Sequence, residues 1–191
     1  MSGGFRLYIR KMIIEAKYHY FIRLYKNKIF TYALYMLKNR MDADDVTQEV
    51  FIKIWKNIEE VNYNSAKTWI IRTTHNACID LLRKRGIELK RETGIDEYFE
   101  ETYAGNKTEN DPYVSFNMKH TGETIKEAIQ RLPGNLKSVF VLYEIEELKY
   151  KEISNSLGIP LNSVKVYLMR ARKRLQEELE KKEICGAENY E

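Results

Sequence analysis

The sequence predicts an all-α protein made of two small helical bundles joined by a flexible acidic linker. Three observations support this prediction. The three prolines, at positions 112, 133 and 160, fall at boundaries between segments. Apolar residues recur with a helical period in both halves of the chain, and no β-rich region interrupts them. Between the halves, residues 92–111 are strongly acidic and show no sustained period, which is typical of a linker.

We expect the first bundle over residues 15–86, the linker over residues 87–120 and the second bundle over residues 121–182. A chain of 191 residues is long enough for two small domains, each with a modest core and little spare stability. The net charge is only +4, but lysine and arginine gather in residues 5–40. Local basic surface of this kind indicates an anionic partner.

Several classes of function are disfavoured by what the sequence lacks. Cys78 and Cys185 form no metal-binding spacing, and Cys78 fits a small buried residue. The histidines at 19, 75 and 120 are isolated, and no glycine-rich phosphate loop occurs. We therefore expect no enzyme, no metal and no cofactor. No leader peptide and no apolar run of membrane-spanning length is evident, so we expect a cytoplasmic protein without direct membrane insertion.

Three helices are expected in the first bundle, over residues 18–38, 46–58 and 67–84. Asp42 is expected to start the second helix, because a short acidic side chain suits a helix N-terminus. The sequence NYNS at 62–65 is interpreted as a turn. The apolar stripes of the first two helices comprise Phe21, Leu24, Tyr25, Phe30, Ala33, Leu34 and Leu37, then Val46, Val50, Phe51, Ile54, Trp55 and Ile58.

The third helix carries two different faces. Its predicted core face comprises Ile70, Ile71, Thr74, Ala77, Cys78, Leu81 and Leu82. On the other side Arg72, Asn76 and Arg83 lie at i, i+4 and i+11, a basic and hydrogen-bonding face. Trp69, near the start of the helix, fits the core better than a stacking platform for bases. His75 is interpreted as a surface residue.

Four helices are expected in the second bundle, over residues 123–131, 134–146, 151–157 and 162–181. The last two are separated by LGIP, in which glycine permits a tight turn and proline stops the first helix from continuing. The predicted core face of the last helix comprises Val164, Leu168, Ala171 and Leu175. Its outward positions are Ser163, Lys165, Val166, Tyr167, Met169, Arg170, Lys173 and Arg174.

This arrangement is the layout of a helix-turn-helix, whose second helix enters the major groove of DNA. An ordinary helical hairpin with a solvated basic face has the same pattern, and the pattern alone leaves the two interpretations balanced. The polar face of the first bundle favours DNA binding, because two basic faces on a flexible tether suit two separated DNA segments. A stand-alone helix-turn-helix regulator is the alternative function. It would explain residues 150–175 but not the acidic start of the helix over residues 42–58.

Three stretches resemble segments of one family. DADDVTQEVFIKIWKNI resembles region 2.2 of bacterial sigma factors, the helix that docks on the clamp of the polymerase β′ subunit. KTWIIRTTHNACIDLLRKR resembles the segment that melts promoters and reads the minus-10 element. Residues 132–175 resemble region 4, which reads the minus-35 element. The order of these stretches, with a tether and no domain between them, is similar to the extracytoplasmic-function (ECF) group over about residues 18–180.

The resemblance implies three groups of site residues. The polymerase-docking group is Asp42, Asp45, Gln48, Glu49 and Lys53. The minus-10 group is Tyr63, Asn64, Lys67, Trp69, Arg72, Asn76 and Arg83. The minus-35 group is Ser163, Lys165, Val166, Tyr167, Met169, Arg170, Lys173 and Arg174. Within that last helix, contacts to phosphates, which position a helix without specifying sequence, are expected from Arg172, Lys173 and Arg174.

The implied partners are core RNA polymerase, through its β′ clamp and β flap, promoter DNA and, as is usual in the ECF group, an anti-sigma factor. Two departures from the family pattern leave details open. The loop EEVNYNSAK is short and lacks the common FRG start, so either Tyr63 or Asn64 could form the pocket for a flipped base. Val166 and Tyr167 replace the small or basic residues that are frequent in the recognition helix, which leaves the preferred minus-35 sequence open.

Overall fold

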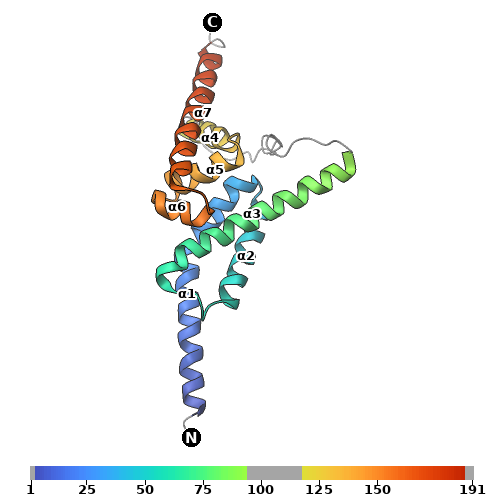
Figure 1. Ribbon diagram of the computed structural model, residues 1–191. Helices are drawn as coiled ribbons and strands as arrows, with labels where there is room; N and C mark the ends of the chain where they lie inside the picture. The colour runs from blue at the N-terminus through green and yellow to red at the C-terminus, as the bar shows by residue number, and fades with distance from the viewer. Residues whose placement is uncertain (1–2, 94–117, 188–191) are drawn as a thin grey trace. The chain divides into compact units, whose positions relative to one another are not determined.

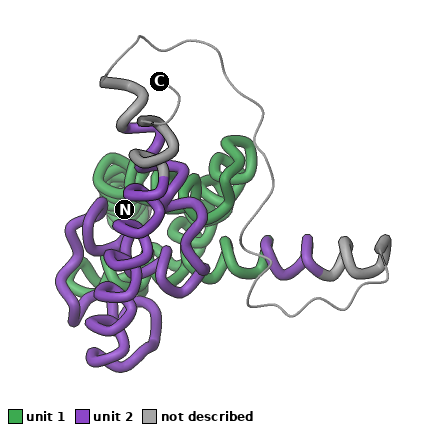
Figure 2. The backbone as a smooth tube through the Cα atoms, turned by 90° about the horizontal axis from the view of Figure 1, so that it is seen from above, with its two compact units in different colours: residues 1–81 green, residues 82–191 purple. Residues whose placement is uncertain are grey.

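The computed structural model describes residues 3–93 and 118–187, and all regular structure in these residues is helical (Figure 1). This confirms the all-α prediction. The chain divides into two compact units, residues 1–81 and residues 82–191 (Figure 2). Most of the predicted linker, residues 94–117, lies outside the described residues.

The first unit begins with a long helix, α1 (Gly3–Leu37). It starts much earlier than predicted, because no glycine or proline occurs from Phe5 to its end to stop the helix. The Arg10 guanidinium contacts the Glu59 carboxylate at 2.6 Å, and the Lys17 ammonium donates to the Ile58 carbonyl oxygen at 2.6 Å. Large apolar side chains are exposed along the first half of α1: Phe5, Leu7, Tyr8, Met12 and Ile13.

The next two helices are α2 (Arg40–Lys56) and α3 (Tyr63–Thr93), and the first half of α1 projects beyond both (Figure 1). Asn39 caps α2, since its side-chain oxygen accepts a 3.1 Å hydrogen bond from the Asp42 N–H. The prediction that Asp42 starts this helix was therefore wrong. The Asn62 side chain accepts a 2.9 Å hydrogen bond from the second N–H of α3, so the last three residues of NYNS are helical rather than a turn.

Most of the predicted core of the first unit is confirmed. The buried side chains of its three helices include Phe21, Tyr25, Ile29, Tyr32, Ala33, Met36, Leu37, Val46, Val50, Ile54, Ile70, Ile71, Thr74, Ala77 and Cys78. Leu24 and Trp55 were predicted to join this core, yet they are 45% and 46% exposed. Because α1 is apolar on nearly every side, its sequence does not define which side packs. The Trp55 ring lies at the edge of its stripe and meets the Tyr18 ring edge-on, with ring centroids 5.0 Å apart.

The boundary between the units falls within α3, at Leu82. The second unit continues with α4 (Met118–Gln130), α5 (Gly134–Phe140), the π-helical turn η1 (Val141–Ile145), α6 (Tyr150–Leu157) and α7 (Leu161–Ala187). The one long helix predicted after Pro133 is thus α5 continued by η1. In η1 the N–H of Glu146 bonds to the carbonyl of Val141 at 3.0 Å, five residues back, as in a π-helix. The buried core includes Ala128, Ile129, Leu132, Leu136, Val139, Leu142, Leu148, Ile153, Val164, Leu168, Ala171 and Leu175.

His75 is half-buried in the first unit, so it is less exposed than the surface position predicted for it. Its Nδ1 lies 2.8 Å from the hydroxyl oxygen of Tyr32, on α1. Burial lowers the pKa of His75 to about 4. Nearby on α3, burial raises the pKa of the Cys78 thiol to about 12, which fits the structural role predicted for that residue.

This burial predicts a pH-dependent stability. The unfolded chain protonates His75 near pH 6.5 and the folded protein only near pH 4, so between these values the unfolded state binds more protons and stability falls as the pH falls. Between about pH 7.5 and pH 4.5, the free energy of unfolding should fall by roughly 1–3 kcal/mol more in the wild type than in His75→Gln. Urea unfolding at the two pH values measures the difference.

The matched control is His19→Gln, because His19 is an exposed histidine on α1. This variant should keep the wild-type dependence on pH. A wild type and a His75→Gln variant that lose equal stability over this range would show that His75 does not supply the dependence.

Candidate nucleic-acid interface

The last two helices, α6 and α7, form the helix-turn-helix predicted from the sequence. Gly158 ends α6 in the left-handed conformation, with φ 69°, where a residue without Cβ is favoured. Its N–H bonds to the carbonyl of Ser154 at 2.9 Å. The predicted core positions of α7 are all buried: Val164, Leu168, Ala171 and Leu175. The packed face therefore fixes the orientation of α7, and its opposite side is open to a ligand.

That opposite side, the outer face of α7, consists of Val166, Met169, Arg170 and Lys173, which are all exposed. They stand at positions i, i+3, i+4 and i+7, so at about 100° per residue they share one side of the helix. Lys165 and Arg174 are also exposed and flank this face, whereas Ser163 and Tyr167 are half-buried. The structure thus brings most of the predicted minus-35 group onto one basic surface with Met169 near its centre.

Arg172 differs from its basic neighbours on α7. Its guanidinium donates two hydrogen bonds to one carboxylate oxygen of Glu144 on η1, from Nε at 2.9 Å and from Nη2 at 2.6 Å. It also lies over the Tyr143 ring, 5.5 Å from the centroid. The hydrogen bonds with Glu144 raise the pKa of Arg172. The Arg172 guanidinium, which was predicted to contact phosphates, is therefore bound to the carboxylate of Glu144 in the same chain.

A second polar face lies on α3. Arg72, Asn76 and Arg83 are exposed and follow one another four and seven residues apart, which places them along one side of the helix. Trp69 is half-buried and borders this line. Three members of the predicted minus-10 group therefore do share one face, and Asn76 lies between two basic side chains.

Tyr63 lies away from this face. It precedes Arg72 by nine residues, or two and a half helical turns, and so points to the opposite side of α3. Its ring packs against Tyr20 and Phe21 of α1, with centroids 5.7 Å and 5.5 Å away, and the Lys17 ammonium lies 5.4 Å from its centroid. Tyr63 therefore belongs to an aromatic cluster with α1. Asn64 is exposed at the start of α3, and Lys67 is half-buried.

The outward face of α2 contains the predicted polymerase-docking group. Asp45, Gln48 and Glu49 are exposed, while Asp42 and Lys53 are half-buried. Glu49 and Lys53 form an ion pair at 2.7 Å. The structure thus presents three members of this group to solvent on consecutive helical turns.

The same face of α2 holds large apolar side chains that were not predicted to be site residues. Met41 and Ile52 are 77% and 54% exposed. Ile52 follows Asp45, Gln48 and Glu49 by seven, four and three residues, so it lies among them. That spacing was the signal by which the sequence could have identified Ile52. An apolar patch with a polar border is the usual composition of a protein interface.

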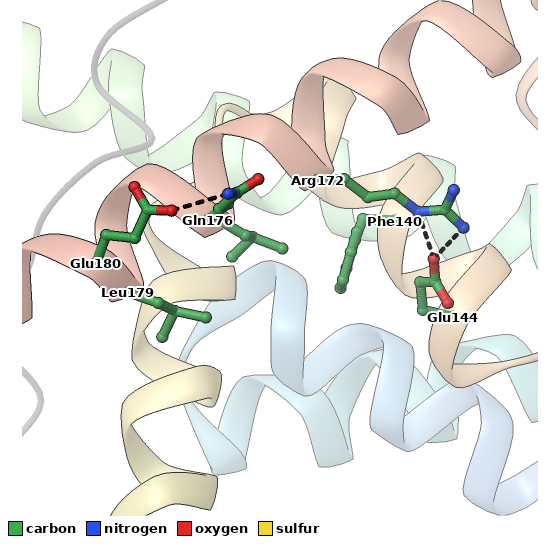
Figure 3. Close-up of a pocket in the computed structure, with 7 residues that line it drawn as sticks. Phe140, Glu144, Arg172, Gln176, Leu179 and Glu180 are labelled. Atoms are coloured by element: carbon green, nitrogen blue, oxygen red, sulfur yellow. Dashed lines mark hydrogen bonds and ion pairs between the residues drawn. The ribbon is translucent and has the colours of Figure 1, made fainter. Parts of the chain in front are cut away.

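An open groove of about 510 Å³ lies between α5, η1 and α7 in the second unit (Figure 3). Its apolar lining comes from Phe140, Leu175 and Leu179, and the polar lining is Glu144, Arg172, Gln176 and Glu180. The Gln176 amide donates to the Glu180 carboxylate at 2.8 Å. The groove is thus an apolar strip with charged ends.

Residues 3–93 and 118–187 contain no cluster of side chains suited to a metal ion. Among the helices that the structure describes, none is long and apolar enough to cross a membrane. The features that these residues do present are a helix-turn-helix, a separate polar helix face and an acidic face with exposed apolar residues. This combination is typical of a two-part helical DNA-binding protein.

Comparison with known proteins identifies the family. Sigma-70 region 2 matches residues 21–87, and Sigma-70, region 4 matches residues 122–175. The ECF RNA polymerase sigma factor SigW of Bacillus subtilis is 33% identical over 165 residues, which cover 83% of this chain and 86% of SigW. The chain belongs to the ECF RNA polymerase sigma factors. This confirms the family and the promoter-directing function predicted from the sequence.

Other relatives are similar at lower identity. SigE of Mycolicibacterium smegmatis is 28% identical over 160 residues, which cover 84% of this chain and 60% of that longer protein. Among solved structures, the sigma factor RpoE in a complex with the anti-sigma factor NepR from Bartonella quintana has a TM-score of 0.66. It is 21% identical, and the match covers 83% of this chain and 94% of that chain. This likeness supports the all-helical fold.

Proposed function

We propose that the chain docks on core RNA polymerase through the outward face of α2, reads a minus-35 element with α7 and opens a minus-10 element with α3. The observation that carries this proposal is the presence of two separate polar helix faces in one chain, each within a stretch that matches a sigma-70 region. A stand-alone regulator would use the helix-turn-helix but has no need for the polar face of α3 or the docking face of α2.

The minus-35 contacts follow from the outer face of α7. The side chain of Arg170 reaches towards base edges, where a guanidinium pairs with two acceptors of guanine. Lys173, one turn further along, lies beside the phosphate backbone and contributes affinity without sequence preference. The buried core face of α7 keeps these side chains in register with the groove.

The minus-10 step uses the face of α3. Asn76 offers both a donor and an acceptor, so its amide can hydrogen-bond to the edge of an unpaired base. Arg72 and Arg83 lie on either side of Asn76 and suit phosphates of the opened strand. Opening then requires no nucleotide hydrolysis by this chain, because binding of the single strand offsets the loss of pairing.

Three partners follow from this assignment. The β′ clamp of polymerase takes the face of α2 that contains Asp45, Gln48 and Glu49. The β flap takes the second unit, where the groove lined by Phe140 and Leu175 offers an apolar strip for a helix or loop. An anti-sigma factor is a further partner, as for RpoE of Bartonella quintana. The chain would act in the cytoplasm, where the polymerase meets promoters.

Transcription reconstituted from purified components tests the proposal. Core polymerase with this chain should give a specific transcript from a cognate promoter, which transcript mapping after induced expression would identify. The chain alone should bind the same DNA far more weakly. Tight operator binding by the chain alone, with no transcript when core polymerase is added, would favour the stand-alone regulator instead.

A sharper prediction concerns Asn76. Asn76→Ala should impair transcription from a duplex promoter by about 10-fold but from a template with a pre-melted minus-10 bubble by much less, because strand opening is the step that its base contact assists. Parallel run-off assays on the two templates measure the ratio. Asn27→Ala, which changes an exposed asparagine on α1, is the matched control and should leave both templates unaffected. An equal loss on both templates would place Asn76 outside the opening step.

A further inference from the structure

A four-residue cluster connects the elements of the helix-turn-helix. Tyr143 and Glu144 lie on η1, Tyr150 opens α6 and Arg172 belongs to α7. The rings of Tyr143 and Tyr150 stack with centroids 4.9 Å apart and an interplanar angle of 17°. The guanidinium of Arg172 lies over the Tyr143 ring. It also bonds twice to the carboxylate of Glu144 (Figure 3).

The backbone around this cluster is unusual. η1 is a π-helical turn. This geometry is rare in proteins as a whole, but where it occurs it is often at a functional site. After it Glu147 adopts a left-handed conformation, with φ 55°, and the Leu148 N–H bonds back to the Leu142 carbonyl at 2.9 Å. This short connection leads directly into Tyr150. The cluster thus joins α7 to the start of α6 through η1, the turn that precedes α6 in the chain.

We infer that Arg172 and Glu144 are positioning residues that set the pose of the recognition helix, and that Arg172 is not a phosphate contact. The inference rests on the proposed minus-35 function of α7. The hydrogen bonds run from α7 to η1, and the aromatic stack extends them to α6. Such a bridge fixes the rotation of α7 against α6 near the residues that carry the outer face.

The location of Arg172 on the helix supports this assignment. Arg172 follows the buried Ala171, and it precedes the exposed Lys173. It lies two residues from Arg170, about 200° around the helix, so the two side chains point to nearly opposite sides. Arg172 therefore extends from the margin of the outer face, three residues after Met169, and its guanidinium turns away from Arg170 to Glu144 on η1.

A substitution at Glu144 distinguishes a phosphate-contact role of Arg172 from a positioning role, because the two roles predict opposite changes in DNA affinity. If Arg172 contacted phosphate, removing the negative charge of Glu144 would free the guanidinium and raise affinity for all DNA. If the pair positions α7, Glu144→Gln lowers affinity for the cognate minus-35 element. Because the pair is exposed, we expect a loss of about threefold to fivefold. Affinity for unrelated DNA should stay unchanged, since phosphate contacts tolerate a small tilt better than base contacts.

The experiment measures the affinity of holoenzyme, made with the full chain, for a cognate promoter and for unrelated DNA at two salt concentrations. Glu144→Gln and Arg172→Gln should each reduce the ratio of cognate to unrelated affinity, and the double variant should lose no more than either single variant. The exchanged pair, Glu144→Arg with Arg172→Glu, should recover most of the ratio. The slope of affinity against salt should stay as in the wild type.

Two controls complete the design. Glu147→Gln removes an exposed acid three residues from Glu144 and should leave the ratio unchanged. Lys173→Ala should lower affinity for both DNAs together. Higher affinity in Glu144→Gln, or a salt slope flattened by about one unit in Arg172→Gln, would overturn the inference and return Arg172 to the phosphate contacts. A wild-type ratio of cognate to unrelated affinity in every pair variant would also overturn it. If instead the wild-type holoenzyme binds the promoter no better than unrelated DNA, the proposed function itself is contradicted.

Discussion

Replacing Asp45 and Glu49 together by lysine is expected to reduce the affinity for core RNA polymerase by about 100-fold or more. Both carboxylates are exposed on α2, and they border Ile52 on the face proposed to dock. The reversal places two positive charges against a partner surface that is proposed to be positively charged. Truncation or reversal at such contacts typically costs several kcal/mol of binding free energy. A titration of labelled chain with core polymerase measures the dissociation constant.

The fold should survive this change, because neither side chain is buried and the core positions of α2 are untouched. A helical circular dichroism spectrum and an unchanged unfolding midpoint would establish this. Glu60→Lys is the matched control, since Glu60 is an exposed acid beyond the end of α2. Retention of polymerase affinity by the double variant would remove α2 from the docking surface.

Loss of the Arg170 side chain is expected to change which minus-35 sequences the holoenzyme prefers. A guanidinium that reads a base edge contributes roughly 1–3 kcal/mol of discrimination at one position, and Arg170→Ala removes it. Lys173→Ala removes a phosphate contact instead, so it should weaken all sequences alike and flatten the salt dependence by about one unit of slope. Holoenzyme affinities across a set of single-base minus-35 variants, at two salt concentrations, measure both effects.

The pattern of affinities distinguishes the roles. A ranking of minus-35 variants that is the same for Arg170→Ala and wild type would show that Arg170 reads no base. If both variants bind every sequence as the wild type does, the outer face of α7 is an ordinary solvated surface. The buried face of α7 contains neither residue, so neither substitution should unfold the second unit.

The recognition helix was predictable from sequence because its local signals agree. Its four core residues fall on a single stripe, and basic residues occupy most of the positions on the other sides. A glycine and a proline punctuate the preceding turn, and glycine is the residue that the left-handed backbone at Gly158 favours. Local backbone preference and hydrophobic period therefore lead to the same answer, and the structure agrees with it.

In α1 and at the edge of α2 the hydrophobic pattern does not define one buried side, and there the predicted core residues were partly wrong. Apolar residues surround α1, so the choice of buried side depends on where α2 and α3 pack. That choice buries Ile29 and Met36 and leaves Leu24 exposed. In the same way Trp55 has the spacing of a core residue but lies at the edge of its stripe, where α1 covers only part of its ring.

The sequence by itself determined the all-helical fold, the helix-turn-helix and the stretches that identify the family, because each depends on residues near one another in the chain. Only the tertiary structure decided which groups Tyr63, His75 and Arg172 contact. Tyr63 packs on α1, His75 meets Tyr32, and Arg172 meets Glu144. Each partner is 28 or more residues away in the chain. Local periodicity gives the direction of a side chain around its own helix, but the group it meets is set by the packing of other helices.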